Sequence, residues 1–122
     1  MDLTFYDAAG KAVAYCDDER HVYAFSGIPL GYLEGNSVWR FDGRHLGWWH
    51  RGWVLDHHGA AVLFTELADG RSLQRPSRQM RPAKGLKGMT PRAATKHAKP
   101  VPFLDGDRWS SRSGSHFFSS ML

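Results

Sequence analysis

The chain has 122 residues, of which 42% are hydrophobic and 13% aromatic, and it carries a net charge of +4 and one cysteine. This length predicts one domain with at most an appendage, and without an apolar run of about 18 residues the chain is not expected to cross a membrane. Cys16 has no second cysteine for a disulfide or a cysteine-rich zinc site, and no basic-then-apolar segment follows Met1. We therefore expect a reducing, cytoplasmic location without a secretory signal.

From residue 3 to residue 64 the chain repeats one pattern four times around a glycine. The glycines are Gly10, Gly27, Gly43 and Gly59, spaced by 17, 16 and 16 residues. An aliphatic residue stands three positions after each glycine and an aromatic residue five positions after it: Val13, Leu30, Leu46 and Val62, then Tyr15, Tyr32, Trp48 and Phe64. Agreement at both positions in all four copies indicates an internal repeat.

Each copy is predicted to be a β-hairpin. Residues 26–27 and 42–43 are two-residue turns of the Ser-Gly and Asp-Gly type, and residues 7–10 and 56–59 are four-residue loops that Asp opens and Gly closes. Isolated hairpins are unstable in water, so the four are expected to pack together. The predicted fold class is all-β, with eight short strands in up-and-down order and the hairpins in a pseudo-fourfold arrangement.

Alternation along the strands separates two faces of each hairpin. One face is large and apolar, and we expect the four hairpins to turn it toward a shared centre. In the third hairpin this face holds Trp39 and Trp48, and counting from the turn places His45 and Trp49 on the opposite side. The opposite face carries small residues at one repeat position, which are Ala14, Gly31 and Gly47. They indicate close approach of a neighbouring hairpin, the tail or a ligand, with packing favoured.

Residues 1–70 form the predicted hairpin domain, or head, and residues 71–122 form a basic tail. The head holds five Lys/Arg and ten Asp/Glu, a net charge of −5, whereas the tail holds eleven Lys/Arg and two Asp, a net charge of +9. Such an asymmetry predicts either that the tail neutralises its own head or that it meets an external polyanion.

Within residues 75–91 a basic residue recurs at every third position, and prolines exclude an α-helix. A period of three predicts polyproline II structure with a basic, an apolar and a Pro/Gly edge. Because Met80, Leu86 and Met89 share the apolar edge, we expect that edge to dock on the hairpins. The final stretch is rich in aromatic residues, which are Phe103, Trp109, Phe117 and Phe118. We expect this stretch to pack back onto the hairpins as a staple.

Three features together resemble the bacterial family called the four-fold β-flower domain. They are the hairpin repeat, the unit VWRFDGRHLGW at 38–48, and the Pro/Gly-spaced tail that ends in RWSSRSGSHFF at 108–118. Gly-x-x-Leu-Gly-Trp at 43–48 is the most specific piece. The resemblance spans the chain and implies a small pseudo-fourfold β head, but it implies no reaction and supplies no catalytic residues. Thr4 stands where the other copies have an aromatic residue, so a fourfold aromatic ring would be incomplete there.

The sequence predicts neither an enzyme nor a metal or cofactor site. A zinc site needs three or four converging ligands, and the adjacent His57 and His58 in a predicted turn do not supply them. Carboxylates follow Cys16 directly and are expected to raise the pKa of its thiol and suppress the thiolate.

Aromatic residues form the predicted binding site. Its members are Trp39, Trp48, Trp53, Tyr23 and Tyr32, with His45 and Arg44 as rim donors. If the hairpins leave a cleft open, these rings suit a small-molecule, sugar-like or polyether ligand; if they close, the rings are only a core. We therefore expect a non-enzymatic binding or assembly module for a small molecule or protein partner.

The alternative is a nucleic-acid-binding protein whose basic tail contacts phosphates. The acidic head competes with nucleic acid for the same charges, which weakens this alternative. No membrane partner is expected, and the chain is expected to be a monomer or a homo-oligomer that exchanges tails.

Overall fold

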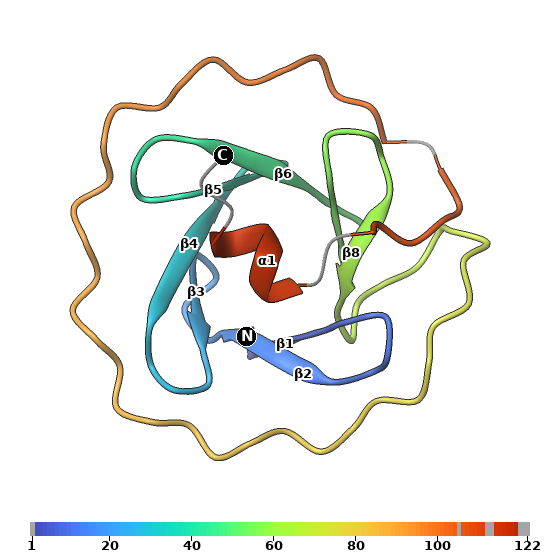
Figure 1. Ribbon diagram of the computed structural model, residues 1–122, viewed down its shortest axis with the longest axis horizontal. Coiled ribbons are helices and arrows are strands. Elements are labelled where there is room, and N and C mark those ends of the chain that lie inside the picture. The colour runs from blue at the N-terminus through green and yellow to red at the C-terminus, as the bar shows by residue number, and fades with distance from the viewer. Residues whose placement is uncertain (1, 105, 112–113, 120–122) are drawn as a thin grey trace.

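The computed structural model describes residues 2–104, 106–111 and 114–119, and these form a closed eight-stranded barrel with the tail around it (Figure 1). The antiparallel strands follow in chain order: β1 (Leu3–Tyr6), β2 (Ala12–Cys16), β3 (His21–Ala24), β4 (Pro29–Glu34), β5 (Ser37–Trp39), β6 (His45–His50), β7 (Trp53–Leu55) and β8 (Ala61–Phe64). The pair Tyr6 and Phe64 joins β1 to β8 and closes the sheet. The predicted all-β class and strand order are confirmed.

All four hairpins share one turn, in which the N–H of the repeat glycine binds the carbonyl oxygen three residues earlier, so the predicted two-residue turns at 26–27 and 42–43 are wrong. Gly27 and Gly43 lie in the turns with φ of +101° and +96°, values that glycine adopts without a Cβ clash. Next to the turn, the strand register of every hairpin slips by one residue. In the third hairpin this bulge pairs Trp39 with His45. His45 therefore lies on the same side as Trp39 and Trp48, and its predicted placement on the opposite side is wrong.

The barrel interior is lined by the face that carries the small residues. A Cβ atom added at Gly47 would lie 2.0 Å from the Leu55 carbonyl oxygen and 3.0 Å from the Phe117 ring, so packing explains this glycine. Across the barrel, Phe5 contacts Trp49 with ring centroids 5.8 Å apart. An eight-stranded barrel leaves room for little more than its own side chains. The prediction that the large apolar faces converge on a shared centre is therefore wrong, and those faces lie on the outside.

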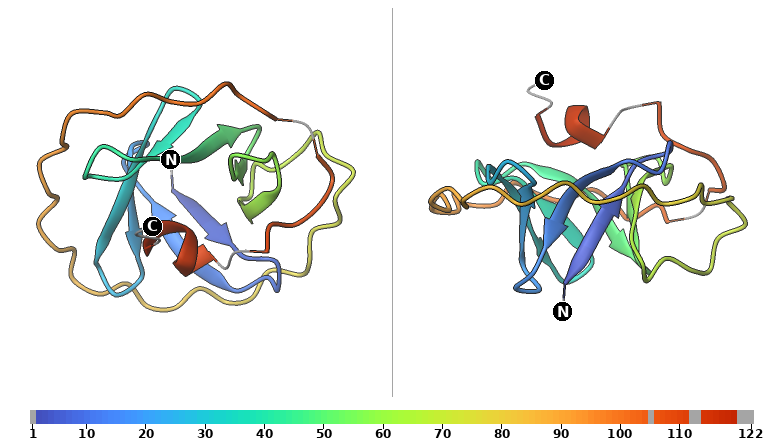
Figure 2. Two further views of the ribbon diagram at one scale, coloured as in Figure 1. Left: turned by 45° about the horizontal axis from the view of Figure 1, so that its top comes forward. Right: turned by 90° about the horizontal axis from the view of Figure 1, so that it is seen from below.

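A short helix, α1 (Gly114–Ser119), closes one end of the barrel (Figures 1 and 2). Phe117 and Phe118 of this helix are 2% and 5% exposed and pack with the inner residues of the strands. Phe117 and Phe118 thus pack on the hairpins as predicted, within a helix that was not predicted, whereas Phe103 of the same stretch is 54% exposed. No helix in the described part of the chain is long and apolar enough to cross a membrane.

Residues 75–104, which we call the belt, run around the outside of the barrel, yellow to orange in Figure 1. Backbone hydrogen bonds attach the belt to successive hairpin turns. The belt donors Gln79, Gly88 and His97 are nine residues apart, and their N–H groups bind the carbonyl oxygens of the turn glycines 10, 27 and 43 at 2.8, 2.7 and 2.7 Å. The belt is thus anchored to the turn glycines of the first three hairpins at intervals of nine residues, while its polyproline II conformation stays a prediction.

The apolar edge of the tail does not dock on the hairpins. Met80, Leu86 and Met89 are 93%, 96% and 94% exposed, so this prediction is wrong. The belt faces the barrel with its backbone N–H groups and its basic side chains instead. The head offers matching partners for these groups, namely turn carbonyl oxygens, carboxylates and aromatic rings.

Candidate functional site

On the outer face, neighbouring hairpins meet in four seams, which we name by their strands: β2/β3, β4/β5, β6/β7 and β8/β1. A cross-strand pair of large side chains occupies each seam, in the same order: Tyr15–Tyr23, Tyr32–Trp39, Trp48–Leu55 and Tyr6–Phe64. Such pairs stabilise a sheet where one face is covered. Here the belt and the neighbouring hairpins cover them.

The structure distributes the predicted site residues over several seams instead of one pocket. Their exposed fractions are 3% for Trp39, 0% for Trp48, 1% for Trp53, 5% for Tyr23, 1% for Tyr32 and 5% for His45. Arg44 is half-buried in the third turn. Trp53 packs against Trp109 of the tail, with ring centroids 5.8 Å apart, and donates its Nε1–H to the carbonyl oxygen of Asp69. A ligand would reach these rings only by displacing covering segments.

His45 sits among aromatic rings as a neutral base. Its ring centroid lies 4.9 Å from that of Trp39 and 4.5 Å from that of Trp48. Its Nδ1 and the Nε2 of His57 share a hydrogen bond of 2.9 Å, and its Nε2 is 3.0 Å from the Ser37 hydroxyl. Burial, reinforced by positive charge on His57 and Lys99, lowers the pKa of His45 to about 4. The network satisfies a buried polar ring rather than presenting it to a ligand.

Basic belt residues cover the seams and pair with carboxylates of the head. In the β2/β3 seam, the Lys87 ammonium lies 4.8 Å from the Tyr23 ring centroid and 2.7 Å from the Asp17 carboxylate. In the β4/β5 seam, Lys96 is 2.9 Å from the Glu34 carboxylate, and its hydrogen bond lowers the pKa of Glu34. The tail thus neutralises part of the charge of its own head.

Sequence reasoning missed the spacing that places these cations. Arg78, Lys87 and Lys96 are nine residues apart, as are Pro82, Pro91 and Pro100. Nine residues of belt match one hairpin of the barrel, so each repeat of the belt brings a cation to one seam. Because nine is a multiple of three, the basic residues at every third position of the tail hide the spacing of nine.

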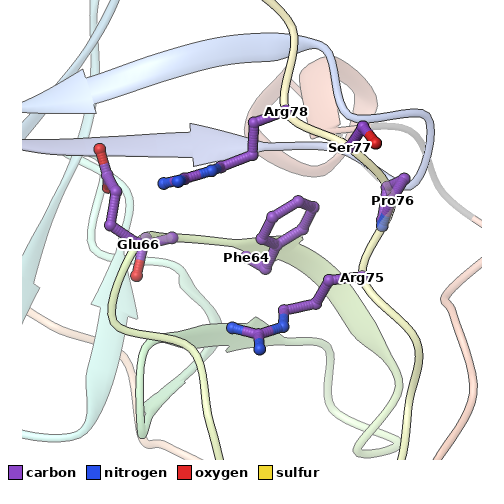
Figure 3. Close-up of a pocket in the computed structure, with 7 residues that line it drawn as sticks. Phe64, Glu66, Arg75, Pro76, Ser77 and Arg78 are labelled. Atoms are coloured by element: carbon purple, nitrogen blue, oxygen red, sulfur yellow. The ribbon is translucent and has the colours of Figure 1, made fainter.

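The β8/β1 seam holds a pocket that was not predicted from the sequence. Its cavity volume is about 320 Å³, and its lining residues are Phe64, Thr65, Glu66, Arg75, Pro76, Ser77 and Arg78 (Figure 3). Glu66 accepts the backbone N–H of Thr4 at 2.9 Å. The guanidinium carbon of Arg78 lies 5.8 Å from the centroid of the Tyr6 ring. The nine-residue spacing of the belt was the signal that could have located it.

Three of the four repeat copies bury a polar atom at the seam. The Tyr15 hydroxyl, the Tyr32 hydroxyl and the Trp48 Nε1 have no hydrogen-bond partner among the described residues. They occupy one repeat position, where the fourth copy has Phe64. Burial raises the pKa of Tyr15, which keeps its hydroxyl neutral. These groups contribute apolar ring area to the seams.

Within the described residues, no three His, Cys, Asp or Glu side chains are grouped to hold a metal ion. A search of curated proteins and of solved structures found no match to the chain. A family model described as 4-fold beta flower protein matches residues 3–118, which is nearly the whole length. With its closed barrel of hairpins and buried aromatic clusters, the chain belongs to the 4-fold beta flower family.

Proposed function

We propose that this chain is a non-enzymatic binding and assembly module that docks another protein along the outward apolar edge of its belt. One observation carries the proposal: Met80, Leu86 and Met89, which are separated by multiples of three residues, are each more than nine-tenths exposed. The backbone between them is fixed to the barrel, because the N–H groups of Gly85 and Gly88 bind carbonyl oxygens of the second hairpin at 2.6 and 2.7 Å.

A fixed apolar edge differs from scattered exposed apolar residues, which are ordinary on protein surfaces. A floppy tail could fold its methionines away from water, whereas a belt that is already ordered keeps them exposed. A partner that binds this edge pays less ordering entropy, since the belt is arranged in advance. Methionine and leucine also adapt well to apolar partner surfaces.

The two expectations that compete with this proposal find less support. Nucleic-acid binding by the tail would use cations that already pair with the head, since Lys84 and Lys87 both contact Asp17. A sugar-like or polyether ligand on the aromatic cluster would have to open the packing, because Trp48 and Trp53 are at most 1% exposed. Both stay predictions, and the belt edge is the surface that is exposed.

Photo-crosslinking tests the proposal. A photoreactive amino acid replaces Leu86 in the full chain, and the matched control carries it at Lys99, an exposed belt residue outside the apolar edge. We expect a discrete light-dependent adduct in native cells from position 86 and not from position 99. An adduct of twice the chain mass would identify a second copy as the partner, and any other mass would identify a different protein.

A serine variant at Met80 and Met89 decides whether the edge itself binds. These side chains lie outside the core, so the variant is expected to keep the wild-type melting temperature while losing the adduct at position 86. An adduct of equal yield in this variant would overturn the proposal. So would the absence of any adduct at position 86 together with a monomer at all concentrations in sedimentation.

A further inference from the structure

The β8/β1 seam differs from the β2/β3 and β4/β5 seams in the placement of its charged side chains. Arg78 is the belt residue nine positions before Lys87, and Glu66 follows β8 as other carboxylates follow β2 and close β4. In the β2/β3 and β4/β5 seams the belt lysine and the head carboxylate are 2.7 Å and 2.9 Å apart. Among the residues that the structure describes, no ion pair joins Arg78 to Glu66. A pocket separates them instead.

Figure 3 shows the arrangement of this pocket. The guanidinium group of Arg78 and the carboxylate of Glu66 point toward one another across it, and the Phe64 ring lies between Arg78 and Arg75. The cavity of about 320 Å³ is at the small end of the range for ligand pockets, which begins at roughly 300 Å³. The site therefore suits a molecule of a few carbon atoms.

Each arginine makes one contact with the head from an exposed position. One N–H of Arg75 donates to the carbonyl oxygen of Ala68, and the Arg78 guanidinium lies over the Tyr6 ring. A guanidinium group in a fixed orientation is pre-organised to bind a carboxylate or phosphate in a bidentate manner. Both arginines of the lining carry donor groups beyond these contacts, because a guanidinium has five N–H donors.

Glu66 determines the second group that a ligand of this pocket must carry, a hydrogen-bond donor. One of its oxygens accepts the Thr4 N–H, and a carboxylate has further lone pairs to accept an ammonium or hydroxyl donor. The pocket thus combines two cations and one anion around an aromatic ring. A simple anion would satisfy the arginines and meet repulsion from Glu66, whereas a ligand with both groups would satisfy all three.

We propose that the β8/β1 pocket binds a small carboxylate or phosphate compound that also carries an ammonium or hydroxyl donor. Arg78 holds the anionic group, Glu66 accepts the donor, Phe64 packs against the carbon atoms between these two groups, and Arg75 adds positive charge from the other side of the Phe64 ring. The pocket is separate from the apolar edge of the belt, so this inference stands independently of the docking function proposed above.

Titration of the full chain, followed by amide resonances of Thr65 and Ser77, tests the inference. The probes are matched pairs with and without an ammonium group: propionate and 3-aminopropionate, then inorganic phosphate and phosphoethanolamine. We expect saturable shifts and several-fold tighter binding of the ammonium-bearing member. The better pair shows whether the carboxylate or the phosphate is preferred.

Variants assign the roles. Arg78→Gln is expected to weaken binding at least tenfold, because it removes a charge-assisted contact. Arg92→Gln removes the same charge from an exposed belt position outside the pocket and is expected to leave binding unchanged. Glu66→Gln is expected to abolish the preference for the ammonium group while leaving the plain anion bound as tightly or more tightly.

The outcomes are decisive in either direction. Equal affinity in Arg78→Gln and Arg92→Gln, or no saturable shift with any probe, would overturn the proposal. If Arg78→Gln loses the dispersed amide spectrum of the folded chain, Glu66→Gln decides alone. A folded Glu66→Gln variant that keeps the ammonium preference would then refute the assigned site.

Discussion

Acidification is expected to destabilise the barrel through His45. In the folded chain the pKa of this residue is about 4, lowered from 6.5 mainly by burial. The unfolded chain therefore takes up a proton at a higher pH than the folded chain does. Stability falls as the pH drops through 6.5 toward 4, because the unfolded state binds more protons there. Linkage gives a loss of about 2 kcal/mol between pH 7 and pH 5, and about 3 kcal/mol once both states are protonated.

Urea denaturation at pH 7 and pH 5 measures this loss. We compare the wild type with His45→Asn, which lacks the imidazole, and with His58→Asn, which changes an exposed histidine of a neighbouring turn. The wild type and His58→Asn should each lose about 2 kcal/mol more on acidification than His45→Asn. If His45→Asn loses as much as the wild type, the proton uptake belongs to other groups and the reasoning fails.

Three further substitutions test the packing. Gly47→Ala places a Cβ atom 2.0 Å from the Leu55 carbonyl oxygen and should cost about 2 kcal/mol or more in urea unfolding; an unchanged free energy would show that this face has space. Phe117→Ala should cost about 3 kcal/mol by the same measurement, and a negligible cost would mean that α1 is not docked. Tyr32→Phe removes a buried hydroxyl without a partner in the described residues, so thermal unfolding should show no loss; a loss above about 1 kcal/mol would reveal a bound water.

Strand order and the positions of the turns were predictable because the signals that set them are local, whereas the predicted two-residue length of the turns at 26–27 and 42–43 is wrong. The positive φ at Gly27 and Gly43 follows from dipeptides that favour tight turns, and the alternation on each side fixes where the strands run. A bulge moves one residue across the sheet and leaves no trace in the alternation itself. Alternation therefore predicts the wrong side for His45, although it groups Trp39 and Trp48 correctly.

Alternation does not say which face is inside. The larger apolar face is predicted to be the core by a rule that holds when only one face of a sheet is covered. Here the belt covers the outer face as well, so rings such as Tyr15 and Trp48 are buried outside the barrel. Gly31 and Gly47 were the stronger signal, since a narrow closed barrel with a helix in its mouth needs small inner residues.

Ion pairs and backbone hydrogen bonds explain why the belt turns its basic edge, and not its apolar edge, toward the barrel. Pairing of Lys87 with Asp17 and a ring contact to Tyr23 give the basic edge partners, and backbone N–H groups find the turn carbonyl oxygens. Backbone N–H groups need hydrogen-bond partners when a segment packs against the barrel. The belt methionines, by contrast, give up only a modest free energy of hydrophobic burial when they face water. The ion pairs and the backbone hydrogen bonds therefore determine which edge of the belt faces the barrel.

Because the barrel repeats one hairpin four times, the seams between its hairpins can be compared with one another. In the β2/β3 and β4/β5 seams a belt cation pairs with a carboxylate of the head. Arg78 and Glu66 occupy the corresponding places and yet face each other across a cavity. The fold alone would be served by closing that pair, as Lys96 and Glu34 do. The proposed binding role of the pocket rests on this difference between the β8/β1 seam and the β2/β3 and β4/β5 seams.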